Sequence, residues 1–170
     1  MSVRKIVTLT HPALRRKTRK VTDFGPKFQS LIDDMIETLR DAPGVGLAAP
    51  QVNVPLKVIV IEFGDEEDET VPPKLYVIVN PAITRLSKER VAGIEGCLSI
   101  PDILGEVERA TEATIRGRNR RGQPIKIKAK GWLARIFQHE VDHLSGVLFV
   151  DRATRLWQQE EQPEEEPVVV

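Results

Sequence analysis

Residues 138–143 read QHEVDH and contain the pattern H-E-x-x-H, in which His139 and His143 lie four positions apart and Glu140 follows the first histidine. Two imidazoles one helical turn apart can bind the same metal ion, and a neighbouring carboxylate can transfer protons. Two protein ligands are too few for a stable catalytic site. The spacing therefore predicts a metal site that takes a third ligand from elsewhere in the chain.

Residues 132–145 are predicted to form the helix that carries this pattern, with Gly146 as its stop. At about 100° per residue, the apolar stripe of the helix is centred on three residues: Leu133, Phe137 and Leu144. The opposite side, predicted to be wetter, carries Arg135, Gln138 and Asp142. Glu140 falls between the histidines and the centre of the stripe. Because burial raises the pKa of a carboxyl group toward neutrality, this position suits a group that takes a proton and returns it.

The third ligand must be chosen from few candidates. No histidine follows His143, since the only other one is His11, and Glu164 to Glu166 stand in an acidic tail interrupted by prolines. Cys97, the only cysteine, stands in GIEGCLSIP (residues 93–101) after a glycine. Its thiolate would complete a set of one sulfur and two nitrogen ligands, with one position open for water or substrate. Buried histidines bonded to backbone and an inert core cysteine are the alternatives.

Length and composition limit the class of protein. The 170 residues are expected to form one catalytic domain at residues 1–160, followed by an acidic, mobile tail at 161–170. The 25 basic and 25 acidic side chains give no net charge, which argues against a dedicated nucleic-acid or membrane-surface protein. We expect a cytoplasmic protein, because neither a signal peptide nor a membrane-spanning run is evident. A single cysteine excludes a disulfide within the chain.

Hydrophobic patterns predict the remaining elements. Apolar residues with helical spacing indicate a helix at 26–40, and a shorter one is expected at about 151–159. Residues 57–63 and 75–80 read as buried strands. Alternation between residues 106 and 130, with a turn at 119–122, indicates an antiparallel hairpin with one buried face.

The hairpin is strongly basic. Its polar face and turn carry seven cationic residues: Arg116, Arg118, Arg120, Arg121, Lys126, Lys128 and Lys130. Charged residues commonly keep an edge strand soluble, and this is the simpler interpretation. The alternative is a docking patch for an anionic partner, such as the ribosome.

Three stretches of the chain resemble, in order and spacing, the three signature motifs of peptide deformylases. They are GVGLAAPQ (44–51), EGCLS (95–99) and HEVDH (139–143), and the similarity runs from HPALRR near the N-terminus to GVLFVDR. The resemblance implies an α+β fold, with antiparallel or mixed β-sheets packed around a central metal-binding helix and with an N-terminal helix. It also implies a hydrolase of protein biosynthesis that removes the formyl group from N-terminal formyl-methionine of nascent chains.

The resemblance assigns roles to individual residues. Cys97, His139 and His143 would bind one divalent metal ion, with Fe(II) favoured and Zn(II), Ni(II) or Co(II) also acceptable to such ligands. Glu140 would be the catalytic acid and base. The side-chain amide of Gln51 and the backbone N–H of Leu98 would bind the developing oxyanion. Gly46 and Val45 would contact the substrate.

Some positions depart from the family pattern. Leu104 stands where many bacterial members carry an arginine, and Trp132 and Arg135 stand where several have aliphatic residues. Two other functions compete with the deformylase. One is a zincin-like endopeptidase that uses the same helix with a carboxylate as third ligand, and the other is a non-catalytic protein that keeps the fold. The intact motifs argue against the second.

Overall fold

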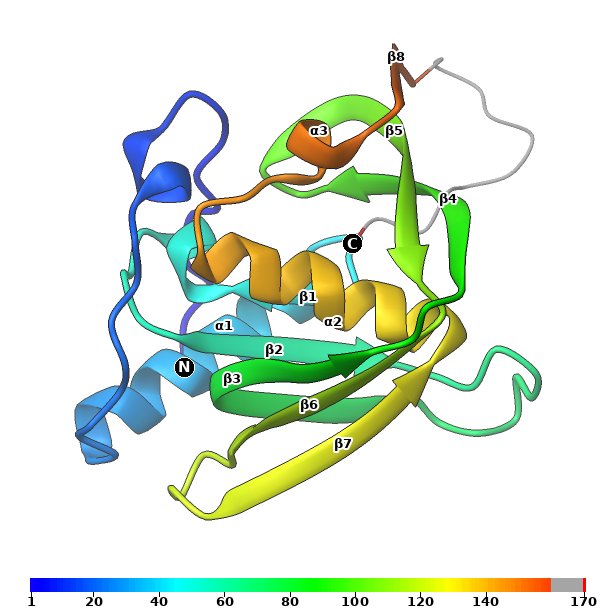
Figure 1. The fold of residues 1–170 in the computed structure, drawn as a ribbon. Helices are drawn as coiled ribbons and strands as arrows, with labels where there is room; N and C mark the ends of the chain where they lie inside the picture. Colours follow the sequence, from blue (N-terminus) through cyan, green and yellow to red (C-terminus); the bar gives the residue numbers. More distant parts are fainter. Residues whose placement is uncertain (160–169) are drawn as a thin grey trace.

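The computed structural model describes residues 1–159 and Val170, so most of the predicted acidic tail lies outside the described residues. Its strands form two antiparallel sheets (Figure 1). The five-stranded sheet has the order β1 (Gly46–Ala48), β2 (Val58–Phe63), β3 (Lys74–Leu86), β6 (Glu112–Arg118) and β7 (Pro124–Lys130). The three-stranded sheet has the order β4 (Arg90–Cys97), β5 (Ile100–Ala110) and β8 (Arg155–Gln158). The predicted α+β class is confirmed.

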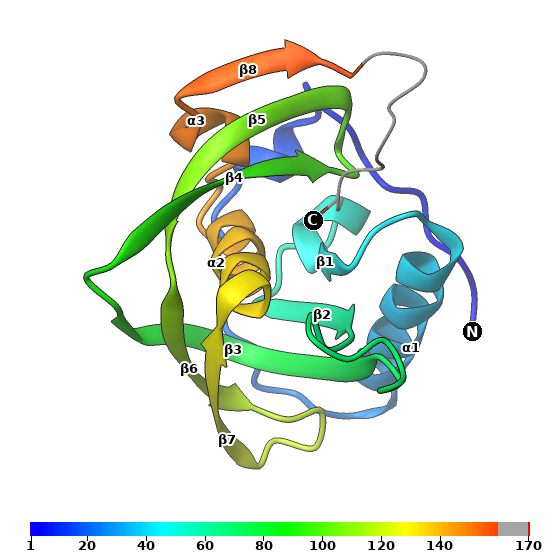
Figure 2. The ribbon, with the colours of Figure 1, turned by 90° about the vertical axis from the view of Figure 1, so that its right-hand side faces the viewer.

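Helix α2 (Gly131–Leu144) lies between the two sheets and contacts strands of both (Figure 2). Its N-terminus follows β7 directly, and the Trp132 N–H donates to the Glu66 carboxylate from the β2–β3 loop. Its C-terminus is followed by Gly146, whose φ of 73° is the left-handed conformation typical of a helix stop. The predicted helix and its stop are therefore confirmed, and the acidic loop supplies a cap that sequence alone did not indicate.

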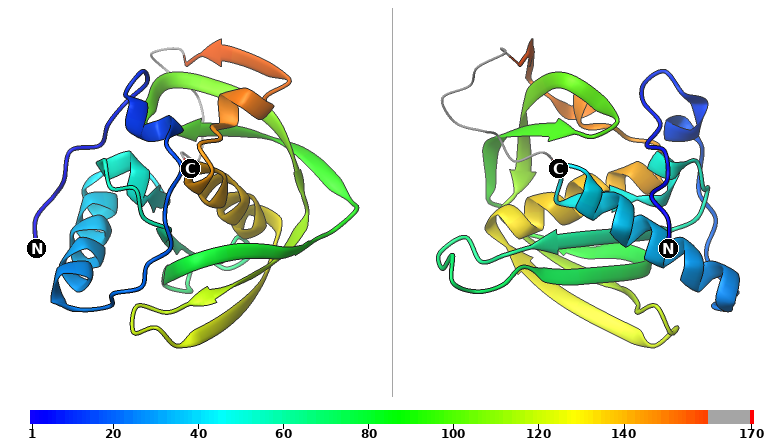
Figure 3. Two further views of the ribbon diagram at one scale, coloured as in Figure 1. Left: turned by 60° about the vertical axis from the view of Figure 1, so that its left-hand side comes forward. Right: turned by 180° about the vertical axis from the view of Figure 1, so that it is seen from behind.

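Helix α1 (Pro26–Asp41) packs against β1 and β2 with the apolar face that its spacing predicts (Figure 3). The buried apolar residues of this face are Phe28, Leu31, Ile32, Met35, Ile36 and Leu39. Proline at its first position and an extended Gly25 before it begin the helix. Short 3-10 helices η1 (Pro12–Arg15) and η2 (Ala49–Val52) complete this side of the molecule.

The prediction of a helix at about 151–159 is wrong. The chain forms a short helix α3 (Phe149–Arg152) and then strand β8, which pairs with β5 so that Trp157 lies opposite Leu104. A four-residue strand has too few residues for a readable alternation, and its hydrogen bonds come from a strand about 50 positions earlier. Leu104 is thereby held in the sheet and is 8% exposed.

The prediction that one side of α2 faces solvent is also wrong for two of the three residues on that side. Arg135 is 2% exposed and Gln138 is 5% exposed, and Asp142 alone is partly accessible. A helical wheel assumes one core face, whereas α2 has a sheet on each side. Polar residues on the second face must therefore find partners within the protein.

The basic hairpin is confirmed as β6 and β7, joined by a turn at residues 119–122. Ile125, Ile127 and Ala129 face the core side, while Lys126 and Lys128 alternate with them and are exposed. β7 is the edge of its sheet. Within the described residues, no helix has the length and apolar character needed to cross a membrane.

Candidate metal centre

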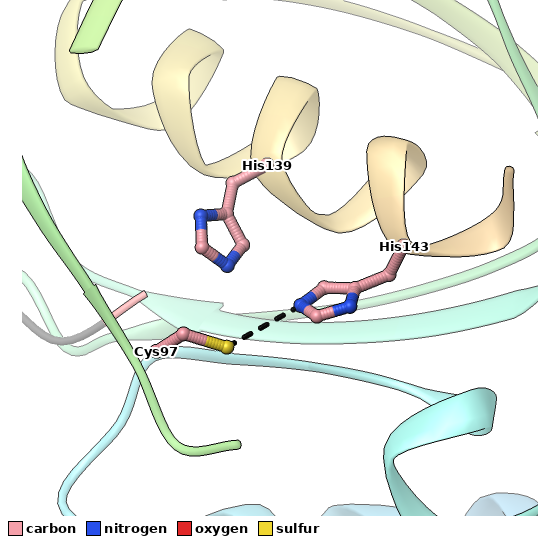
Figure 4. Close-up of side chains that lie close together, drawn as sticks. All are labelled: Cys97, His139 and His143. Atoms are coloured by element: carbon pink, nitrogen blue, oxygen red, sulfur yellow. Dashed lines mark hydrogen bonds between the residues drawn. The ribbon is translucent and has the colours of Figure 1, made fainter. Parts of the chain in front are cut away.

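The third ligand candidate comes from the three-stranded sheet. Cys97 is the last residue of β4, and α2 presents His139 and His143 toward it (Figure 4). The Cys97 Sγ lies 3.4 Å from Nε2 of His143. One ligand atom from each of the three residues can be chosen so that all lie within 4.8 Å of one another.

The free nitrogen of His139 fits a metal ligand. Its Nδ1 lies 2.9 Å from Oε1 of Glu95, while its buried Nε2 has no hydrogen-bond partner among the described residues. A tetrahedral ion with these ligands needs donor atoms roughly 3.3–3.5 Å apart, given metal–sulfur and metal–nitrogen distances of about 2.3 and 2.0 Å. The observed spacing requires only small side-chain shifts. One thiolate and two imidazoles therefore suit Zn(II) or Fe(II) and fill three of the four tetrahedral positions.

Burial controls the charges of these groups. It raises the pKa of the Cys97 thiol to about 12, with the nearby Glu140 carboxylate adding to the rise. Burial also lowers the pKa of His143 well below its ordinary value. Without a cation the site thus favours a neutral thiol and a neutral imidazole. A metal ion would compensate the thiolate, so the set of donors is suited to a cation.

Glu140 lies next to this cluster and has no partner of its own. It is fully buried, and neither carboxylate oxygen accepts a hydrogen bond within the described part of the chain. Its Oε1 lies 4.0 Å from Nε2 of His139. Burial, and then the charge of Glu95, raise the pKa of Glu140 well above its ordinary value. Such a carboxyl group keeps its proton to higher pH than an ordinary glutamate and can exchange it with a nearby group.

The glycine-rich motif lies directly against Glu140. A Cβ on Gly46 would stand 2.8 Å from the Oε1 of Glu140, so a larger residue could enter only if the carboxylate moved. Gly46 begins β1, which is the edge of the five-stranded sheet, and the Val45 carbonyl accepts from the Glu62 N–H on β2.

The carbonyl of Gly96, the residue before Cys97, accepts from the Val170 N–H at 3.0 Å.

Gln51 is oriented so that its amide nitrogen faces the site. Its Oε1 accepts from the Ala48 N–H at 2.9 Å, which leaves Nε2 to donate to Ser99 Oγ at 3.1 Å and toward Cys97 Sγ at 3.6 Å. Leu98 occupies the turn between β4 and β5, next to Cys97, and its side chain packs over Gly44. The residues predicted for this site are thus gathered in one place.

Sequence reasoning missed the polar network behind His139. Glu95 is fully buried and accepts two hydrogen bonds from Arg109 (2.9 Å each), one from Arg135 (2.7 Å) and one from Nδ1 of His139. Arg109 also bonds Asp142 at 2.7 Å. Burial raises the pKa of Glu95, but the hydrogen bonds from His139 and Arg109 outweigh burial and hold the pKa well below its usual value.

A signal for Glu95 was present in the sequence. Glu95 stands two residues before Cys97 in the same motif, so a ligand role for Cys97 would bring this carboxylate close to the site. Metal-binding histidines commonly donate their second nitrogen to a carboxylate. The arginines could not be found in this way, because their partners come from other elements.

Comparisons with known proteins agree on one family. A family model described as polypeptide deformylase matches residues 3–159. A peptide deformylase from Halothermothrix orenii is 44% identical over 92% of this chain and 97% of its own length. The crystal structure of a peptide deformylase from Legionella pneumophila has a TM-score of 0.81 at 41% identity and covers 90% of this chain and 87% of its own. The peptide deformylase structure from Thermotoga maritima has a TM-score of 0.84 at 35% identity and covers 91% and 100%.

Proposed function

The chain belongs to the peptide deformylase family, and from this premise we propose that it removes the formyl group from N-terminal formyl-methionine of nascent polypeptides and releases formate. The observation that carries the proposal is the buried group of Cys97, His139 and His143, beside Glu140, whose carboxylate has no hydrogen-bond partner in the described part of the chain. These residues belong to two of the three motifs, EGCLS and HEVDH. The reaction is hydrolysis of a linear amide that depends on a metal ion.

We assign the metal ligands as Cys97 Sγ, His139 Nε2 and His143 Nε2. His139 must use Nε2, because its Nδ1 is engaged by Glu95. Fe(II) is the proposed native ion on the basis of the family resemblance, and Zn(II), Ni(II) and Co(II) are compatible with the same donors. A divalent ion held there would polarise the formyl carbonyl and lower the pKa of a water molecule.

The remaining roles belong to the chain's own side chains. Glu140 would take a proton from the attacking water and pass it to the leaving amine, for which its raised pKa is suited. The Gln51 amide and the Leu98 N–H would donate to the oxygen that becomes negative, an interaction worth about 3–4 kcal/mol for one donor. Gly46 and Val45 would contact the substrate backbone along the edge of β1.

Selection of formyl over larger acyl groups is proposed to depend on the close approach of β1 to α2. A formyl carbon carries only hydrogen, whereas acetyl carries a methyl group. The space beside Glu140 is so narrow that even a Cβ on Gly46 would lie under 3 Å from the carboxylate. Crowding of this kind favours the smaller substrate.

A zincin-like endopeptidase is not favoured. It needs a carboxylate as third ligand, and the candidates Glu164 to Glu166 lie outside the described residues, whereas Cys97 lies within 3.4 Å of His143. The metal content of two variants distinguishes the endopeptidase from the deformylase. Cys97→Ser should lose the metal, and a chain shortened after Gln159 should retain it. Full metal content in Cys97→Ser, with loss in the shortened chain, would contradict the deformylase assignment.

The decisive test is formate release from formyl-Met-Ala-Ser by protein prepared without oxygen, measured beside acetyl-Met-Ala-Ser and casein. We expect formate from the first substrate and no cleavage of the other two. Casein hydrolysis, or no formate from metal-loaded protein, would reject the function. Loading separate samples with Fe(II), Zn(II), Ni(II) and Co(II) would rank the ions.

We propose that the basic hairpin also supports transient binding to the ribosome. Lys126, Lys128 and Lys130 are exposed along the edge strand β7. Arg120 is less available, because it bonds Gln29 and Asp33. Reversing the three lysines to glutamate should weaken co-sedimentation with ribosomes and reduce its salt dependence. The control reverses Lys17 and Lys20, which are exposed elsewhere, and an equal loss per reversed lysine in that control would reject a specific patch.

For the chain as a whole, we propose one catalytic domain at residues 1–160. We also propose that the protein acts in the cytoplasm, where nascent chains emerge from ribosomes. The assigned ligands come from both β4 and α2, which supports a site that requires the complete fold. Limited proteolysis should therefore find no smaller fragment that keeps the metal.

A further inference from the structure

Arg135 is an arginine buried in the interior, with every contact made within the protein. Its side chain is 3% exposed, and its NH1 donates to Glu95 Oε2 at 2.7 Å and to the Val107 carbonyl at 2.8 Å. Its NH2 donates to the Val91 carbonyl at 2.8 Å. Burying a guanidinium group is costly unless its charge and donors are satisfied. This position therefore requires a set of matched partners.

Gly93 provides the space for this guanidinium. A Cβ built on Gly93 would stand 2.7 Å from Cζ of Arg135, 2.8 Å from NH2 and 2.9 Å from Nε. Any side chain at residue 93 would thus displace the charged end of Arg135 from its present position. Gly93 lies on β4, two residues before Glu95, and its φ is not in the left-handed region. The close approach, not the backbone conformation, requires glycine here.

The contacts of Glu95 lead from Arg135 to the metal centre. Arg109 binds both carboxylate oxygens side-on, and Arg135 bonds Oε2. This leaves Oε1 to accept the Nδ1–H of His139 at 2.9 Å. Because Oε1 of Glu95 engages Nδ1 of His139, Nε2 is the ring nitrogen whose lone pair is left for a metal ion. The orientation of Glu95 therefore decides where that lone pair points.

We propose that Arg135 is a positioning residue for the metal centre, acting through Glu95 on His139, and that Gly93 is its required counterpart. The proposal rests on the proposed function, because it takes Cys97, His139 and His143 as the ligands. Arg109 fixes the plane of the Glu95 carboxylate, and Arg135 fixes the end opposite His139. The two guanidinium groups together hold His139 Nε2 toward Cys97 and His143.

A purely structural role is the competing account, since Arg135 also ties α2 to the carbonyls of β4 and β5. The two accounts differ in what they predict for His139. A structural tie predicts a loss of thermal stability alone. A positioning role predicts weaker metal binding and a changed His139 ring environment, beyond what the stability loss explains.

The test compares three variants with a matched control. Arg135→Met removes the charge and keeps an unbranched apolar stem, Arg135→Lys keeps the charge, and Gly93→Ala retains both charges but displaces the guanidinium. The control is Arg120→Met, which removes an arginine that pairs with Asp33 away from the site. Co(II) affinity is measured by competition with a chelator. In metal-free protein, the Nδ1–H proton of His139 is followed by nitrogen-15 NMR, and melting temperature is recorded for each.

We expect Arg135→Met and Gly93→Ala each to weaken Co(II) binding by about tenfold, the lower end of the range for residues behind metal ligands. Both should shift or broaden the His139 Nδ1–H signal. Arg135→Lys should fall between Arg135→Met and the unmodified protein, and Arg120→Met should change neither readout. If Arg135→Met does not fold, Gly93→Ala and Arg135→Lys still decide the question.

Unchanged Co(II) affinity and an unchanged His139 signal in Gly93→Ala and Arg135→Met, with only a lower melting temperature, would overturn the proposal. Failure of the underlying function is distinguishable. If the unmodified protein binds no Co(II), or Cys97→Ser binds it equally well, the assigned metal centre is wrong. The NMR comparison in metal-free protein then decides the role of Arg135 by itself.

Discussion

The two sides of α2 each bury a carboxylate, and the two carboxylates have opposite surroundings. Glu95 faces one side and accepts four hydrogen bonds from three side chains, so its pKa is lowered. Glu140 faces the other side and has no partner among the residues described, so its pKa is raised. Both are fully buried. Equal burial is therefore accompanied by a lowered pKa at Glu95 and a raised pKa at Glu140, according to the partners supplied.

The largest expected effect comes from the unpaired carboxylate. Glu140→Gln keeps the shape of the side chain but cannot accept and return a proton, so formate release should fall by roughly 10²–10⁴-fold. Metal content should stay the same, because Glu140 is not assigned as a ligand. Steady-state assays with metal analysis of the same samples check both. Joint loss of metal and activity would contradict the role.

Replacing Glu95, the carboxylate with four hydrogen bonds, should lower metal affinity and protein stability together. Glu95→Gln leaves the buried Arg135 without its anion, so the free energy of unfolding should fall by about 3–5 kcal/mol. Metal affinity should fall by about 10–100-fold, because His139 loses its anionic acceptor. Urea unfolding and chelator competition measure these. Glu106→Gln, at a partly exposed carboxylate on the neighbouring strand, is the control and should change neither.

Metal binding should depend on pH through Cys97. Its thiol has a pKa of about 12 in the metal-free protein and must lose its proton to become a ligand. Apparent metal affinity should therefore rise about tenfold per pH unit across the neutral range, with about one proton released per ion. Titration in weakly buffered solution with a pH indicator measures the release. The Glu140→Gln background removes the other carboxyl group that could contribute, and zero release there would reject a thiolate ligand.

The smallest expected effect is on the free energy of unfolding, which should change in opposite directions when each of the two carboxylates is replaced by methionine. In metal-free protein, Glu140→Met should raise the free energy of unfolding by about 1–3 kcal/mol, because it removes an unpaired buried acid. Glu95→Met should lower it. A raised folded pKa means that the folded state binds more protons than the unfolded state above about pH 4.5, so stability falls as pH rises through that window. The gain from Glu140→Met should thus be small at pH 4 and larger at pH 8, and an equal gain at both would contradict it.

The sequence was sufficient for the helix that carries the histidines and for the burial of Glu140. Both follow from helical spacing within one segment, and the fully buried Glu140 agrees with its place between the histidines and the apolar stripe. The family motifs then pointed to Gln51 and Cys97. The sequence of each segment alone was enough to find these residues, because each motif is short and continuous.

The rest depended on contacts between distant segments. Arg135 was placed on the wet side of α2, because a wheel cannot show that a second sheet covers that face. β8 was missed because its partner β5 lies about 50 residues earlier. The same holds for Glu66, which accepts from the Trp132 N–H at the start of α2 from the β2–β3 loop. In each case the partner, not the residue's own pattern, determines the structure.

The assigned ligands lie on two layers of the molecule, Cys97 at the end of β4 and the histidines on α2. An ion held by them would cross-link the three-stranded sheet to the helix and close the chain between residues 97 and 139 into a loop. By chain-entropy arguments used for disulfides, closing a loop of that size is worth about 4 kcal/mol. The melting temperature of this protein should then report the free metal concentration around it.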